Sequence, residues 1–175
     1  MATPASALAQ LATSCEKEGL TPFNGEKLAH AIAQQFKLRE DEVAILRVEE
    51  TRLTFVYPAK LHDVGHIPLN TTGSVAGRTA ATKRPEAINN FPQTRHVSVF
   101  ESVDLSGGNH PLTMEKHEKP QIQKLMSAPV LRDGRSVGVV QICRKGASGP
   151  TAGADFRPED LQRLVAACAD IANCF

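Results

Sequence analysis

Residues 122–146 read IQKLMSAPVLRDGRSVGVVQICRKG, and this stretch decides the fold class. It contains two runs, 122–133 and 136–145, that are apolar on both faces and meet at a turn, Asp133-Gly134-Arg135. Two such runs around a short glycine-containing turn are typical of adjacent antiparallel strands. Because neither face of the pair is polar, we predict that both strands lie in the centre of a sheet.

A second hairpin is predicted upstream, where apolar residues alternate with polar ones from Val43 onward. After the polar turn 49–51, the residues Leu53, Phe55 and Tyr57 alternate with Arg52 and Thr54. Alternation with a period of two indicates a strand with one buried face. We therefore expect the three apolar side chains to lie on the same face of the sheet.

Helices are predicted at both ends of the chain. Thr3, Pro4 and Gly19 suit the cap, first turn and exit of a helix over 1–20, and Asn24 suits the cap of a second one. The closing helix is expected over 157–175. Its apolar residues recur at steps of three and four and form a seam that packs on the sheet, or pairs with the N-terminal helix and a second subunit: Leu161, Leu164, Cys168, Ile171 and Phe175.

The segment between the two hairpins predicts a short helix within 73–81, a strand at 87–90 and a long lid loop over 91–121. The sequence thus predicts one α/β domain of the α+β type over 1–175, with its sheet core at 24–145. The N- and C-terminal helices cover one face of a central antiparallel sheet. The short helix and the lid cover the other face and form a cup.

Composition excludes several classes of function. The chain has 20 Lys plus Arg against 19 Asp plus Glu, so it has no strong field to attract nucleic acid or an anionic membrane. The N-terminus lacks the basic and apolar regions of a signal peptide. We expect a cytoplasmic protein that acts on a partner in trans or is part of a longer chain.

Three segments, taken in order, resemble the GAF domain family: 73–90 (GSVAGRTAATKRPEAINN), 122–146, and 156–172 (FRPEDLQRLVAACADIA). The resemblance covers most of the chain from Glu26 onward. It implies a small-molecule sensor or dimerisation module that holds its ligand between the sheet, the short helix and the lid. The cyclic-nucleotide pattern of that family is broken here, because Arg144 and Leu161 replace two of its residues, although Lys145 and Asp160 can still connect strand and helix.

The cup gives the candidate ligand site, in which polar groups surround an apolar floor. Arg78 or Arg95 can hold a carboxylate or phosphate through paired hydrogen bonds. The ligand itself is unknown. The candidate residues are Tyr57, Arg78, Thr79, Asn89, Asn90, Phe91, Arg95 and His96.

No catalytic or metal site is predicted. His62, Asp63 and His66 are close in sequence, but such residues recur by chance in polar loops. The four cysteines lack the paired spacing of zinc or redox sites and are expected to be reduced thiols: Cys15, Cys143, Cys168 and Cys174.

Three functions remain in view. The first is a GAF-type sensor that signals through its terminal helices as a homodimer. The second is a ligand-free interaction module whose cup is filled by its own side chains. The third is a redox enzyme similar to the GAF-fold free methionine sulfoxide reductases, which depends on Cys143 but lacks the family's resolving cysteines.

Overall fold

The computed structural model describes residues 6–63, 65–93 and 120–175. Within them, six strands form one antiparallel sheet in the order β3-β2-β1-β6-β5-β4. The strands are β1 (Val43–Glu49), β2 (Arg52–Tyr57), β3 (Ile67–Pro68), β4 (Glu86–Ile88), β5 (Gln121–Arg132) and β6 (Arg135–Gly146). The helices are α1 (Ala7–Cys15), α2 (Pro22–Phe36), α3 (Val75–Thr82) and α4 (Pro158–Asp170).

The β5–β6 hairpin forms the middle of the sheet, as its two apolar faces predict. Each strand has 12 residues, and β6 pairs with β1 on its other side while β5 pairs with β4. Asp133 and Gly134 have φ values of 50° and 73°. Positive φ at both central residues is the turn geometry that matches strand twist, and Asp-Gly adopts it readily.

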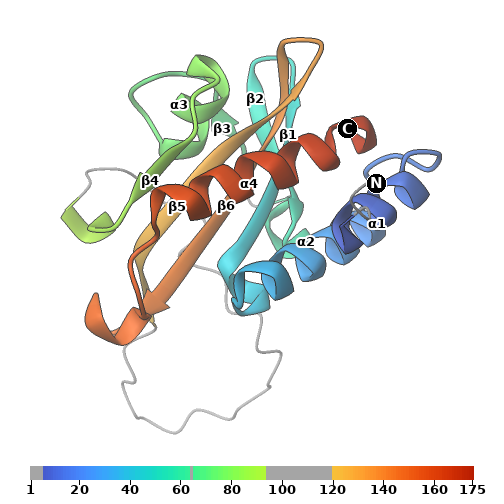
Figure 1. Cartoon of the computed structure of the whole chain (residues 1–175). Helices are drawn as coiled ribbons and strands as arrows, with labels where there is room; N and C mark the ends of the chain where they lie inside the picture. The colour runs from blue at the N-terminus through green and yellow to red at the C-terminus, as the bar shows by residue number, and fades with distance from the viewer. Residues whose placement is uncertain (1–5, 64, 94–119) are drawn as a thin grey trace, which may run out of the picture.

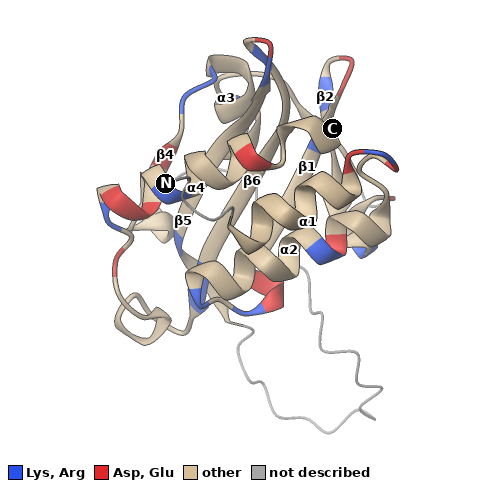
Figure 2. Ribbon diagram, turned by 45° about the vertical axis from the view of Figure 1, so that its right-hand side comes forward, with Lys and Arg blue, Asp and Glu red and all other residues tan. Residues whose placement is uncertain are grey.

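α1, α2 and α4 lie together on one side of the sheet, and α3 lies on the other (Figures 1 and 2). Two separate clusters of buried apolar side chains follow from this arrangement. The larger cluster lies between the sheet and the three helices, and we call that side the helix face. The smaller cluster lies beneath α3, and we call that side the α3 face. The predicted placement of helices on the two faces is therefore confirmed, whereas most of the lid predicted over 91–121 lies outside the described residues.

The apolar seam of α4 packs against the core of its own subunit. Leu164, Cys168 and Ile171 are buried against the sheet, with Leu161 and Phe175 packed at its border. α1 lies beside α4 as well: the Ser6 hydroxyl donates to the Asp170 carboxylate at 3.1 Å, and the Cys174 thiol donates to the Ala12 carbonyl at 3.5 Å. Both termini of the described chain consequently lie at one end of the sheet (Figure 1).

Two predicted helix caps are wrong. α1 begins at Ala7 after Ser6, whose hydroxyl accepts a hydrogen bond from the Ala9 N–H, and Thr3 lies outside the described residues. α2 begins at Pro22 and is capped by Thr21 rather than by Asn24. Proline at the first helical position places the cap one residue before it. The buried Asn24 amide instead donates to Gly19 and Glu18.

The predicted alternation of β2 is interrupted at its end. Ile45 pairs with Tyr57 while the next residue, Leu46, pairs with Phe55, which leaves Val56 as an extra residue. Such a β-bulge reverses the side to which the following side chain points. Phe55 accordingly belongs to the cluster on the α3 face, whereas Tyr57 belongs to the one on the helix face.

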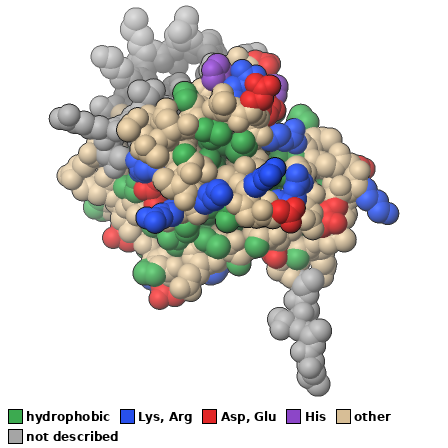
Figure 3. All heavy atoms as spheres, turned by 90° about the horizontal axis from the view of Figure 1, so that it is seen from above, with side chains coloured by type: hydrophobic (Ala, Val, Ile, Leu, Met, Phe, Trp, Pro, Cys, Tyr) green, Lys and Arg blue, Asp and Glu red, His purple; other side chains and the backbone are tan. Residues whose placement is uncertain are grey.

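Charged side chains of both signs are interspersed along the described chain (Figure 2). At the end of the molecule seen in Figure 3, Lys and Arg side chains lie beside an area of hydrophobic side chains. Among the described residues, no helix has the length and hydropathy required to cross a bilayer.

Candidate functional site

α3 is a short helix held very close to the sheet. Ser74 caps its start by accepting from the Gly77 N–H at 2.9 Å, and Lys83 ends it in the left-handed conformation at φ 58°. A Cβ at Gly77 would collide with the backbone oxygen of Pro68, so only glycine permits this approach. The cluster below α3 forms an apolar floor that includes Phe55, Leu125 and Cys143.

Thr79 fastens α3 to the sheet. Its Oγ1 lies 2.8 Å from the Val75 carbonyl oxygen and 2.8 Å from Ser127 Oγ. The Gln141 side chain then donates to Ser127 Oγ at 3.3 Å. Thr79 and Ser127 are fully buried, and buried polar groups require such partners. The predicted ligand residue Thr79 is thus part of a structural hydrogen-bond chain between α3, β5 and β6.

Arg78 lies on α3 and forms a paired contact with Glu86 of β4. Its Nε and Nη2 donate to the two carboxylate oxygens at 3.0 and 2.9 Å. This hydrogen bonding raises the pKa of Arg78 further. The fork that was expected to hold an anion is therefore satisfied within the protein, and an anionic ligand has to compete with Glu86 for it.

Asn89 and Phe91 follow β4 and have structural contacts of their own. The Asn89 amide donates to the Phe156 carbonyl at 3.0 Å, and its oxygen accepts from the Phe156 N–H at 2.8 Å. Phe91 is buried in the floor cluster. Asn90 is exposed, and its carbonyl accepts from Gln93 at 3.3 Å. The remaining predicted residues, Arg95 and His96, lie outside the described residues.

Tyr57 is not brought together with these residues, because the bulge turns it to the helix face. Its hydroxyl donates to the Glu40 carbonyl at 3.2 Å. Burial, reinforced by the nearby carboxylates of Glu40, Glu26 and Asp41, raises the pKa of Tyr57 to about 12. Tyr57 lines a separate pocket of about 460 Å³ beside α2, which includes the exposed side chain of Phe23.

A buried charged cluster borders the floor where β6 ends. The Lys145 ammonium lies 3.4 Å from Asp41, and the Lys145 backbone N–H donates to Glu42 at 2.8 Å. The Glu42 carboxylate also accepts from Arg39.

Asp160, in the first turn of α4, accepts from the Arg157 N–H at 2.9 Å and from Arg163 at 3.5 Å.

Cys143 lies on the floor of the α3 face and is fully buried. Burial raises the pKa of the Cys143 thiol well above its ordinary value, against the opposing effect of Lys145. A thiol in this state is a poor nucleophile. The other three cysteines, all within the described residues, belong to the helix-face cluster, so none can serve as a resolving thiol beside Cys143.

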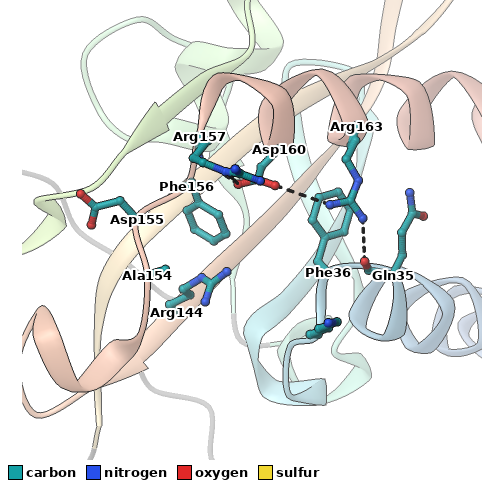
Figure 4. A pocket seen from close by; sticks show the side chains of 10 residues that line it. Gln35, Phe36, Arg144, Ala154, Asp155, Phe156, Arg157, Asp160 and Arg163 are labelled. Atoms are coloured by element: carbon teal, nitrogen blue, oxygen red, sulfur yellow. Dashed lines mark hydrogen bonds and ion pairs between the residues drawn. The ribbon is translucent and has the colours of Figure 1, made fainter.

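A second pocket, at residues that no sequence pattern indicated, lies between the end of α2 and the start of α4 (Figure 4). Its walls include Arg144, Arg157 and Arg163. In the sequence, the only indication of this pocket is that its positions include several arginines. The fold is needed to show that residues from β6 and α4 converge with the end of α2.

The order of elements around this sheet, with α3 on one face and α2 and α4 on the other, can be compared with known families. The GAF domain profile matches residues 26–175. The chain is a GAF domain. No curated protein matches it.

Solved structures similar to this GAF domain come from proteins of different activities. The GAF domain of an Acinetobacter phosphoenolpyruvate-protein phosphotransferase has 14% identity and a TM-score of 0.63, covering 99% of this chain and 94% of that one. Residues 122 to 287 of a methyl-accepting chemotaxis protein have 12% identity and a TM-score of 0.62, covering 94% of each chain. A substrate complex of Neisseria meningitidis free methionine-R-sulfoxide reductase has 16% identity and a TM-score of 0.59, covering 100% and 94%. At these identities the likeness establishes the fold alone.

Proposed function

We propose that this GAF domain is a sensory or regulatory domain that binds a small ligand on its α3 face. The observation that carries the proposal is the separate apolar floor beneath α3, on the opposite side of the sheet from the main core. Ligand sites are typically apolar surfaces with a few oriented polar groups at their border. Here the Arg78–Glu86 pair and the exposed Asn90 provide such groups.

A contact between the two faces supports the proposed signalling role. Asn89, which follows β4 near α3, holds both backbone polar groups of Phe156. Phe156 precedes α4, which begins at Pro158. A ligand that moves the end of β4 therefore acts directly on the start of α4. Two arrangements of this contact, favoured by the free and bound states, are sufficient to couple the faces.

We further propose that the signal leaves through the terminal helices of a homodimer. The apolar seam of α4 is already buried within the subunit, so the dimer has to use the outward side of the helix layer. Val165 of α4 is 40% exposed and supplies an apolar contact there. Substitution V165E is expected to shift the protein from dimer to monomer in light scattering, with little loss of thermal stability; an unchanged mass would contradict this interface.

The ligand-binding proposal is tested with two matched leucine deletions. Leu125 lies on the floor of the α3 face and Leu164 in the helix-face core, and both are buried. A metabolite panel first identifies a ligand that raises the melting temperature. We expect L125A to weaken that ligand at least about tenfold, from lost apolar contact. L164A is expected to lower stability yet retain affinity, measured by calorimetry at a temperature where both variants are folded.

Equal loss of affinity in both variants, or in L164A only, would contradict a site on the α3 face. A panel without any stabilising ligand would instead favour the interaction module. We also place the domain in the cytoplasm, since its cysteines are free thiols, as expected in a reducing compartment.

A further inference from the structure

The pocket between α2 and α4 has a volume of about 460 Å³ and lies on the helix face, away from α3. The end of α2 contributes Phe36 and Lys37, and β6 contributes Arg144. The segment before α4 contributes Phe156, and α4 contributes Arg163 (Figure 4). This volume is within the range that accommodates a small organic molecule.

Two arginines in this pocket are held against aromatic rings. The Arg144 guanidinium lies 4.9 Å from the centre of the Phe156 ring, and the Arg163 guanidinium lies 4.9 Å from the centre of the Phe36 ring. Arg163 also donates to the Gln35 carbonyl at 2.8 Å. Stacked guanidinium groups lose little further conformational freedom when they bind a ligand. The two cations are therefore fixed in place before any ligand arrives.

Among the described residues, no acidic side chain forms an ion pair with the Arg144 guanidinium. Its Nε is buried and has no hydrogen-bond acceptor. The neighbouring carboxylates are engaged elsewhere: Asp155 lies 2.7 Å from Lys124 Nζ, and Asp160 contacts Arg157 and Arg163. A partly buried guanidinium without an acceptor is costly, and an anion reduces that cost.

Gly153 is fitted to this arginine. It has φ 95°, which non-glycine residues rarely adopt, and a Cβ there would lie 3.0 Å from Arg144 Nη1. Any larger residue would press against the guanidinium. The turn before α4 is thus shaped to leave room for the Arg144 side chain.

We propose that this pocket binds a small organic oxyanion, a carboxylate or phosphate ester, through the Arg144 guanidinium, with Arg163 lining the same pocket. The proposal does not depend on ligand binding at the α3 face. Because the pocket joins the end of α2 to the start of α4, an anion here holds together two of the helices that cover the helix face. Both ligand types present two neighbouring oxygens that a guanidinium can bind through paired hydrogen bonds.

The experiment uses phenyl phosphate and benzoate as probes, each titrated into the ¹⁵N-labelled full chain at constant ionic strength, with sodium chloride as the control. We expect saturable shifts of the Arg144 Nε–H signal and of backbone amides at 156–163 with at least one probe. R144Q should weaken binding at least about tenfold, since it removes a charge-assisted pair of hydrogen bonds. R144K keeps the positive charge but cannot form the paired hydrogen bonds of a guanidinium. Because it keeps a long cationic side chain in place, this variant guards against a loss of binding that is caused by misfolding.

R135Q, on the exposed β5–β6 turn, is the matched control and should leave affinity unchanged. A response to phenyl phosphate alone assigns the site to phosphate esters, and a response to benzoate alone assigns it to carboxylates. Neither probe saturating, equal shifts with chloride, or undiminished binding by folded R144Q and R144K would each overturn the proposal.

Discussion

The two faces of the sheet are stabilised in different ways. The helix face carries three helices over a large aliphatic core, with side chains such as Leu28, Ile32 and Leu164 completely buried. The α3 face carries an eight-residue helix over a smaller cluster, and hydrogen bonds of Thr79 and Arg78 position that helix. Burial of apolar area thus secures the helix face, whereas specific polar contacts determine where α3 lies.

The largest expected effect comes from deleting a core side chain on the helix face. L28A should lower the free energy of unfolding by about 2–5 kcal/mol, because it leaves a cavity in a tightly packed core. Its counterpart I88A, at the partly buried border of the α3 face, should cost less than half as much. Urea denaturation measures both. Equal losses would contradict the difference in burial between these two positions.

The next largest effect concerns the hydroxyl that fastens α3. T79V should cost about 1–3 kcal/mol, because Ser127 loses a buried partner. T82V is a close control: its hydroxyl also bonds to the carbonyl four residues earlier, at 2.8 Å, but it is exposed. T82V should change stability by less than about 0.5 kcal/mol. Similar values for the two variants would show that the buried chain does not position α3.

Alkaline pH should weaken the helix face through Cys168. Burial raises the pKa of this thiol from 9.0 to about 12. Between these values the unfolded chain releases the proton while the folded chain keeps it, so stability falls as pH rises from 9 towards 12. The contribution is up to about 1.4 kcal/mol per pH unit. C168A should flatten the slope of unfolding free energy against pH, and an identical slope would contradict its burial.

The smallest effect is expected for the ion pair on the α3 face. Arg78 and Glu86 are each about one-third exposed, with side-chain accessibilities of 35% and 28%. Solvent screens such a pair, so a double-mutant cycle with R78A and E86A should give a coupling of no more than about 1 kcal/mol. A markedly larger coupling would mean that this pair, rather than Thr79, is the main anchor of α3 to the sheet.

The sequence predicted the sheet and its helix layers better than it predicted the site. The β5–β6 hairpin and the α4 seam follow from local periodicity, because burial on one or both faces dictates the pattern. Tyr57 was assigned to the wrong face because a single-residue bulge leaves no periodic signal of its own. Periodicity does not encode which side chains meet between different elements. Arg78 of α3 pairs with Glu86 on β4, and Asn89 pairs with Phe156, which precedes α4.

Native mass spectrometry of the domain, purified without denaturation, tests the central claim most directly. We expect a dimer that carries one additional small-molecule mass per subunit, with that mass lost from L125A and retained by L164A. Subunits without added mass, together with no thermal stabilisation by any member of a metabolite panel, would contradict a ligand-binding α3 face.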